Sequence, residues 1–203
     1  KAALEARGES RTVMLVPESA HGTNPATAAF AGFSIESIPA TADGRVDLAA
    51  LTARLGPDVA GVMITNPNTC GLFEREMKTI SDAVHAAGGY VYCDGANFNA
   101  IVGKVRPGDL GIDAMHINLH KTFSTPHGGG GPGSGPVVLS KALSPFGPLP
   151  YTARMPDGTV RLIEEEDGAA EHPQSFGRMA AFHGQMGMFT RALAYIMSHG
   201  ADG

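Results

Sequence analysis

The sequence has little charge, few cysteines and no long apolar run. Only 15 of 203 residues are Lys or Arg, and they form no basic stripe, so no nucleic-acid partner is expected. Cys70 and Cys93 form no CxxC pair, which argues against a zinc ribbon or a disulfide-rich secreted scaffold. No apolar run approaches the roughly 20 residues that span a bilayer, and the first ten residues lack a signal-peptide pattern. We therefore expect a soluble, cytoplasmic chain with no membrane partner.

The residues that are abundant indicate a globular α/β fold. The chain is 43% hydrophobic and contains 27 Gly and 14 Pro, which is too apolar for a disordered tail and too rich in Gly and Pro for a helix bundle. Strand-length apolar runs cover residues 12–16, 33–39, 59–65, 90–94, 114–119 and 136–140. Several are apolar on both faces, which is typical of a mainly parallel sheet with helices on both faces.

Helices are predicted between the strands and at the end of the chain. Residues 47–55 begin with Asp47, a favourable N-cap, and residues 74–87 end at two glycines. Residues 151–163 predict a hairpin. The last helix, about residues 177–199, carries an apolar stripe that we expect to pack against the core: Met186, Phe189, Leu193 and Ile196.

Two charged residues follow neighbouring strands of the predicted sheet. Asp94 ends the apolar run 90–94, and Lys121 follows the run 114–119. Ligands of open α/β sheets bind at the carboxyl ends of the strands. A desolvated Asp suits a protonated heterocyclic nitrogen, and a partly buried Lys with a lowered pKa suits Schiff-base chemistry. Together they predict a pyridoxal phosphate (PLP) site.

Other patterns nearby are weaker. The glycines of residues 128–135 lack the Gly-Lys-Ser/Thr ending and following helix of a P-loop, so a hinged or close-approach loop fits better. His116, His120 and His127 have no acidic partner at ligand spacing, so no metal is expected. His120, beside Lys121, fits an acid, base or positioning role instead.

Four segments together resemble one known family. HGTNPATAAFAGF (21–33), TNPNTCGLFE (65–74), the block from YCDGANF to GPV (92–137) and PQSFGRMAAFHGQ (173–185) are similar to glycine dehydrogenase (decarboxylating), the P-protein family of the glycine cleavage system. The likeness runs over nearly the whole chain, and its last part is closest to the PLP-bearing subunit 2 of the two-subunit bacterial form.

The resemblance implies an oxidoreductase with PLP-dependent transferase fold type I and a seven-stranded, mainly parallel sheet. Lys121 would bind PLP covalently, and Asp94 would hold the pyridine nitrogen. Ala96 and Asn97 would flank the ring. His120, Thr23 and Asn24 would line the glycine pocket. Glycine would lose its carboxylate as carbon dioxide, and the aminomethyl group would pass to the lipoyl arm of the H-protein.

The resemblance also implies that residues 1–203 are part of a larger PLP-binding domain. The family's N-terminal part and C-terminal small domain lie outside them. We therefore expect these residues alone to bind PLP weakly and to be nearly inactive. The expected partners are glycine, the lipoylated H-protein and the other P-protein subunit, in a heterotetramer.

Two alternatives stay open at this stage. Another fold-type-I PLP enzyme, such as an aminotransferase or a cysteine desulfurase, would share Asp94 and Lys121, but a desulfurase needs a catalytic Cys on a mobile loop. A non-catalytic scaffold subunit of the same fold would not be expected to keep Lys121.

Overall fold

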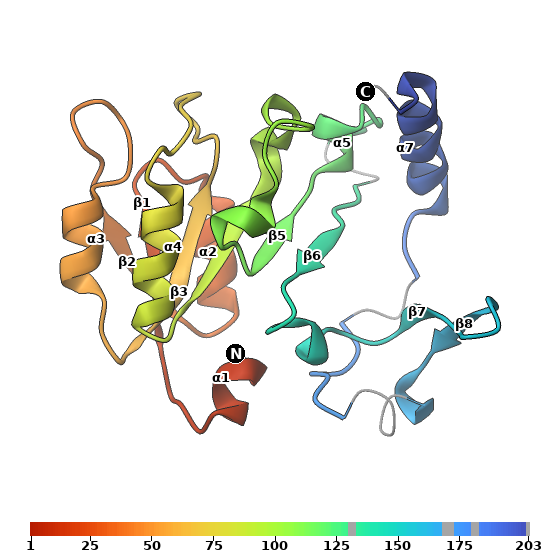
Figure 1. Ribbon diagram of the computed structural model, residues 1–203, viewed down its shortest axis with the longest axis horizontal. Coiled ribbons are helices and arrows are strands. Elements are labelled where there is room, and N and C mark those ends of the chain that lie inside the picture. The colour runs from red at the N-terminus through yellow and green to blue at the C-terminus, as the bar shows by residue number, and fades with distance from the viewer. Residues whose placement is uncertain (130–132, 168–172, 180–182, 202–203) are drawn as a thin grey trace.

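The chain is built around a six-stranded sheet with the order β2-β1-β3-β4-β5-β6 (Figure 1). The computed structural model describes residues 1–129, 133–167, 173–179 and 183–201. The strands are β1 (Val13–Pro17), β2 (Ser34–Ile38), β3 (Val59–Thr65), β4 (Tyr90–Asp94), β5 (Ala114–His116) and β6 (Val137–Leu139). All neighbours pair in parallel except β5 and β6, which are antiparallel.

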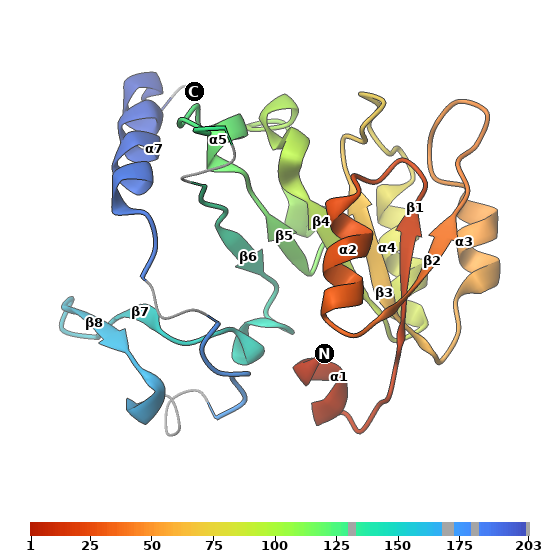
Figure 2. The same cartoon turned by 180° about the vertical axis from the view of Figure 1, so that it is seen from behind.

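Helices cover both faces of this sheet. Figure 1 shows α3 and α4 in front of it, and Figure 2 shows α2 on the opposite face. The helices are α1 (Ala2–Ala6), α2 (Thr23–Phe30), α3 (Leu48–Arg54), α4 (Met77–Ala86), α5 (Leu119–Thr122) and α7 (Met186–His199), with 3-10 turns η1 (Gly95–Ala100), η2 (Pro107–Leu110) and η3 (Ser144–Phe146). The predicted α/β class is confirmed.

The main core lies between the sheet and the α3–α4 layer. Leu15, Val62 and Val91 of three adjacent strands pack there with Leu51 and Ile80 of the two helices, and all five are fully buried. A smaller cluster on the α2 face contains Val16, Ala28 and Met63. Burial on both faces is why these strands are nearly continuous apolar runs.

The strand predictions are accurate and the helix boundaries less so. β3 and β4 occupy the predicted residues, and Asp47 caps α3 by accepting a hydrogen bond from the backbone N–H of Ala50. β5 ends at His116, before the predicted end at residue 119, because α5 begins at Leu119. Helix α4 begins at Met77, not at residue 74, where the carboxylate of Glu74 is buried and accepts hydrogen bonds from Val46 and Asn68.

Helix α2 has no counterpart in the sequence prediction. Pro25 lies in the first turn, where a backbone N–H would have no partner within the helix. The remaining residues of the helix are uncharged. Pro17 and the polar residues that follow it are typical of a loop, so the composition of this stretch does not predict a helix.

The C-terminal part departs most from expectation. The hairpin forms as predicted, with β7 (Tyr151–Arg154) paired antiparallel to β8 (Val160–Ile163). Helix α7 begins at Met186, not at about residue 177, and residues 180–182 lie outside the described part. Its buried residues are Met188 and Ala192. Met186, Leu193 and Ile196 are exposed, so the prediction that their stripe packs against the core is wrong for the described residues.

Two further expectations bear on the architecture. The resemblance implies seven strands, whereas the main sheet has six within the residues that the structure describes. In the same residues, no helix is both long enough and apolar enough to cross a membrane.

Candidate active site

A cavity of about 710 Å³ lies where the parallel strands end, at the upper edge in Figure 1, where α5 follows β5. All seven site residues predicted from the sequence line it, namely Thr23, Asn24, Asp94, Ala96, Asn97, His120 and Lys121. They come from α2, from the end of β4 and the turn that follows it, and from α5. Parallel strands bring these distant segments together because their carboxyl ends share one edge.

Asp94 is the acidic group of this cavity. It is the last residue of β4, is 6% exposed, and its Oδ1 accepts a hydrogen bond from the backbone N–H of Ala96 at 3.0 Å. Burial acts to raise the pKa of this carboxyl. The His116 ring, the Ala96 N–H and the charge of Lys121 outweigh burial, so the pKa is lower than that of an ordinary aspartate. Asp94 is therefore a carboxylate at neutral pH.

The turn after β4 joins Asp94 to the loop that follows β3. The side-chain amide of Asn97 donates hydrogen bonds to the carbonyls of Pro67 and Asn68, at 3.0 and 3.2 Å. Its Nδ2 is therefore occupied by the neighbouring loop, and Asn97 fixes the shape of this wall. Its predicted place beside a ring, like that of Ala96, stays a prediction.

The wall opposite is the start of α2. The backbone N–H of Thr23 donates to His21 Nδ1 at 3.1 Å, and Asn24 is buried with no partner for its Nδ2 among the described residues. The hydroxyl of Thr69 donates to the carbonyl of Ser19 and so ties the β1 end to the β3 end. The fold therefore places Thr23 and Asn24 at the same cavity as Asp94.

Lys121 and His120 lie on the single turn of α5. Lys121 is exposed, so the expected partial burial of its amine is wrong; α5 is short and lies at the open end of the sheet. Within the described part of the chain, its amine has neither an ion pair nor a hydrogen bond. The His120 ring packs edge-on against His127 with centroids 4.5 Å apart. Burial, followed by the charges of His127, Lys121 and His116, lowers the pKa of His120.

The sequence prediction missed several residues of the cavity. Thr65 and Tyr92 lie on β3 and β4, and His116 ends β5 opposite Asp94 in the parallel register. The strand register identifies His116, because His116 and Asp94 are the last residues of adjacent strands and are paired with each other. No group of three or more metal-ligating side chains occurs among the described residues.

The cavity's donor set fits a charged aromatic cofactor. It offers an ionised carboxylate, a lysine amine with no ion pair in the described structure, and imidazole and amide groups. Four of its lining residues carry a buried polar atom with no partner among the described residues: Asn24 Nδ2, Thr65 Oγ1, Asn118 Oδ1 and His120 Nδ1. Buried polar atoms are rarely left unpaired in a finished site, so this wall is suited to a polar occupant.

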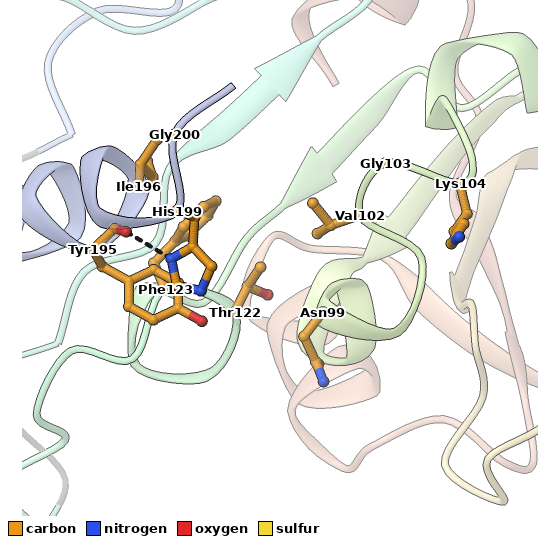
Figure 3. A pocket seen from close by; sticks show the side chains of 10 residues that line it. All are labelled: Asn99, Val102, Gly103, Lys104, Thr122, Phe123, Tyr195, Ile196, His199 and Gly200. Atoms are coloured by element: carbon orange, nitrogen blue, oxygen red, sulfur yellow. Dashed lines mark hydrogen bonds between the residues drawn. The ribbon is translucent and has the colours of Figure 1, made fainter. Parts of the chain in front are cut away.

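A second cavity lies on the other side of α5, between α7 and residues 99–104 (Figure 3). It measures about 540 Å³, and Tyr195 and His199 of α7 face Val102 across it, with Thr122 and Phe123 between them. None of its described lining residues is a carboxylate. The cavity around Asp94 offers the acid that a PLP site needs and is therefore the candidate active site.

The cysteines bear on the desulfurase alternative. Cys93 is buried within β4, and burial raises the pKa of its thiol to about 12, so it is not a nucleophile at neutral pH. Cys70 is exposed but is not among the residues that line the cavity. Neither is placed as a desulfurase requires.

Comparison with known proteins shows strong similarity to one group. A protein of Caulobacter vibrioides named probable glycine dehydrogenase (decarboxylating) subunit 2 is 64% identical over 204 residues, which cover 100% of this chain and 38% of that protein. A protein of the same name from Nitrosococcus oceani is 53% identical over 98% of this chain and 40% of its own length. The chain thus spans about two fifths of these curated relatives.

Solved structures share the fold. A glycine decarboxylase (P-protein) of the glycine cleavage system, in inhibitor-bound form, superposes with a TM-score of 0.74 at 23% identity, over 100% of this chain and 46% of that one. A Burkholderia pseudomallei sphingosine-1-phosphate lyase gives a TM-score of 0.65 at 18% identity, over 99% and 44%. The fold is therefore PLP-dependent transferase fold type I, as predicted.

The family model described as aminotransferase class-V matches residues 4–200. Enzymes of this class depend on pyridoxal phosphate, which agrees with the donor set around Asp94 and Lys121. Nearly the whole chain is covered by this match. The chain therefore belongs to the class-V aminotransferase family.

Proposed function

We propose that this chain carries the cofactor site of a glycine decarboxylase of the glycine cleavage system. The observation that carries the proposal is the cavity in which Asp94 and Lys121 meet at the ends of neighbouring strands. The names of the relatives at 64% and 53% identity support glycine as the substrate. The lipoyl arm of an H-protein as acceptor, a second P-protein subunit in a heterotetramer and a cytoplasmic location are part of the same proposal.

When bound, pyridoxal phosphate supplies an electron sink for the pair of electrons left when the substrate carboxylate departs as carbon dioxide. Lys121 would hold the cofactor through Nζ, because its amine has no competing ion pair in the described structure. Asp94 would hold the proton of the ring nitrogen, because its carboxylate is ionised and desolvated. The positive charge thereby kept on the ring is what makes it a good electron sink.

His120 would act beside Lys121 as an acid, a base or a positioning group. Its lowered pKa keeps the ring neutral at pH 7, so it can accept a proton. Thr23 and Asn24 would line the space for glycine at the start of α2. Residues 1–203 would form part of the PLP-binding large domain.

Borohydride trapping tests the assignment of Lys121. The chain is incubated with PLP, reduced, digested and mapped by mass spectrometry, and we expect the label on the peptide that contains Lys121. Lys104 gives a matched control, since it is an exposed lysine that lines the second cavity. Lys121→Ala should abolish the absorbance band of the PLP Schiff base, whereas Lys104→Ala should keep it.

The same mapping can contradict the proposal. A label found on Lys104 or on another lysine, with Lys121 unmodified, would remove the central assignment. Labelling that persists in Lys121→Ala would do the same.

A further inference from the structure

His116 is a titratable residue that lines the cavity and has no role in the proposed mechanism. It is the last residue of β5, and its Cα is paired with that of Asp94 in the parallel register. Its Nδ1 lies 3.7 Å from Asp94 Oδ1, an ion-pair distance that is too long for a hydrogen bond. The side chain of Asp94 is buried, and that of His116 is partly buried.

The backbone around His116 leaves its ring little freedom. A Cβ added to Gly135 would lie 2.6 Å from Nε2 of the His116 ring, so the chain at the start of β6 presses against it. A Cβ added to Gly95 would lie 2.1 Å from the His116 carbonyl oxygen. The approach at Gly95 is to backbone and requires glycine, so it fixes the position of the His116 backbone. The approach at Gly135 is to the ring itself and limits the space into which the imidazole can turn.

The two oxygens of Asp94 have different surroundings. Oδ1 accepts the Ala96 N–H and faces His116, whereas no donor within the described chain reaches Oδ2. Tyr92 and Cys93 of the same strand are uncharged at neutral pH, because burial raises the pKa of each to about 12. The side chains that lower the pKa of this carboxylate are those of His116 and, with a smaller effect, Lys121.

A second histidine–aspartate pair in the chain shows what a purely structural pair is like. His85 Nε2 lies 2.7 Å from Asp113 Oδ2, and that oxygen also accepts the Val91 N–H, while Oδ1 accepts the Ser140 hydroxyl. Every oxygen of Asp113 is therefore used within the fold. Asp94 differs because one oxygen is left over, in a cavity.

We propose that His116 is a positioning residue, which donates from Nδ1 to Asp94 Oδ1 and thereby leaves Oδ2 directed at the ligand. The two atoms already lie at ion-pair distance, so the pair acts without a ligand, and the contact of 3.7 Å shortens when the ligand binds, as catalytic hydrogen bonds often do. That the ligand is the ring nitrogen of PLP rests on the proposed function. The pairing of His116 with Asp94 is independent of the proposed function.

The pairing is tested on the chain without cofactor. Carbon-13 NMR of the side-chain carboxyl carbons follows the titration of Asp94 in the wild type and in His116→Leu, His116→Asn and His85→Asn. We expect the Asp94 midpoint to move to higher pH in His116→Leu only, because Asn keeps an N–H donor near the same place. His85→Asn removes a histidine of equal size from the other pair and should leave the midpoint unchanged.

A measurement on the wild type covers the case in which His116→Leu fails to fold. Nitrogen-15 NMR of the imidazoles reports the tautomer, and we expect the neutral His116 ring to carry its proton on Nδ1. A proton on Nε2 overturns the proposal. An Asp94 midpoint that is unmoved in His116→Leu, or moved equally in His85→Asn, overturns it as well.

A PLP titration separates this inference from the proposed function. Followed by absorbance, the dissociation constant of PLP should rise about tenfold in His116→Leu, the effect of losing one charge-assisted hydrogen bond. It should stay within about twofold in His116→Asn and His85→Asn. If PLP is trapped on a lysine other than Lys121 while the Asp94 midpoint still responds to His116, the proposed function fails and the pairing stands.

Discussion

At the scale of single residues, the chemistry of the site depends on keeping Asp94 charged inside a largely apolar strand end. Desolvation alone would raise its pKa. The Ala96 N–H, the His116 ring and the charge of Lys121 reverse that tendency, and each comes from a different segment of the chain. Asp94 is therefore sensitive to changes in its neighbours that leave Asp94 itself intact.

This balance predicts how stability depends on pH. The pKa of Asp94 is lower in the folded than in the unfolded chain, so the ionised carboxylate stabilises the fold. This stabilisation is fully present above the ordinary aspartate pKa of about 3.9. It is lost as the pH falls through the pKa of Asp94 in the folded chain. When the pH is lowered from 7 to 3, the free energy of unfolding should fall more for the wild type than for Asp94→Asn. Urea unfolding at both values measures it.

A matched variant keeps that result interpretable. Asp109 is exposed, and Asp109→Asn should show no comparable change. A wild-type to Asp94→Asn difference that is the same at both pH values would contradict the lowered pKa.

At the scale of elements, strands were easier to predict than helices. β3 is buried along its whole length and β4 along most of it, so nearly all their residues are apolar and the first polar residue marks each end. Helix α2 is largely exposed and has a proline in its first turn, so no apolar pattern identifies it. The stripe of α7 has helical periodicity, but periodicity alone does not say what lies against it.

Close packing between two strands makes one glycine indispensable. A Cβ on Gly61 of β3 would lie 2.1 Å from the carbonyl oxygen of Tyr90 on β4, against backbone that has no room to move. Gly61→Ala should lower the free energy of unfolding by about 3 kcal/mol. Thermal or urea unfolding measures this loss.

Gly108 in η2 is the control for that substitution. Nothing lies within 4 Å of a Cβ added there, and its φ is not positive, so Gly108→Ala should change stability by no more than about 0.5 kcal/mol. Equal losses at the two positions would show that the strand contact is not what matters.

At the scale of the whole molecule, the candidate site is open and its lysine is exposed. The chain spans about two fifths of its curated relatives. Efficient decarboxylation benefits from a site that excludes water, and the described residues leave Lys121 accessible.

We therefore predict that these 203 residues alone bind PLP weakly and decarboxylate glycine little or not at all. Release of labelled carbon dioxide from carboxyl-labelled glycine, with lipoylated H-protein present, measures the turnover. The full-length relative from Caulobacter vibrioides, assayed with its partner subunit, is the positive control. Robust turnover by the 203 residues alone would refute the prediction.

Sequence by itself determined the α/β class, most strands and the residue types of the site, because burial and strand ends constrain which side chains are allowed. Asp94 and Lys121 stand out for that reason. Only the tertiary structure decided that His116 lies beside Asp94, that Gly95 and Gly135 press on it, and that Lys121 is exposed. These features depend on strand register and on contacts between distant segments, which leave no local pattern in the chain.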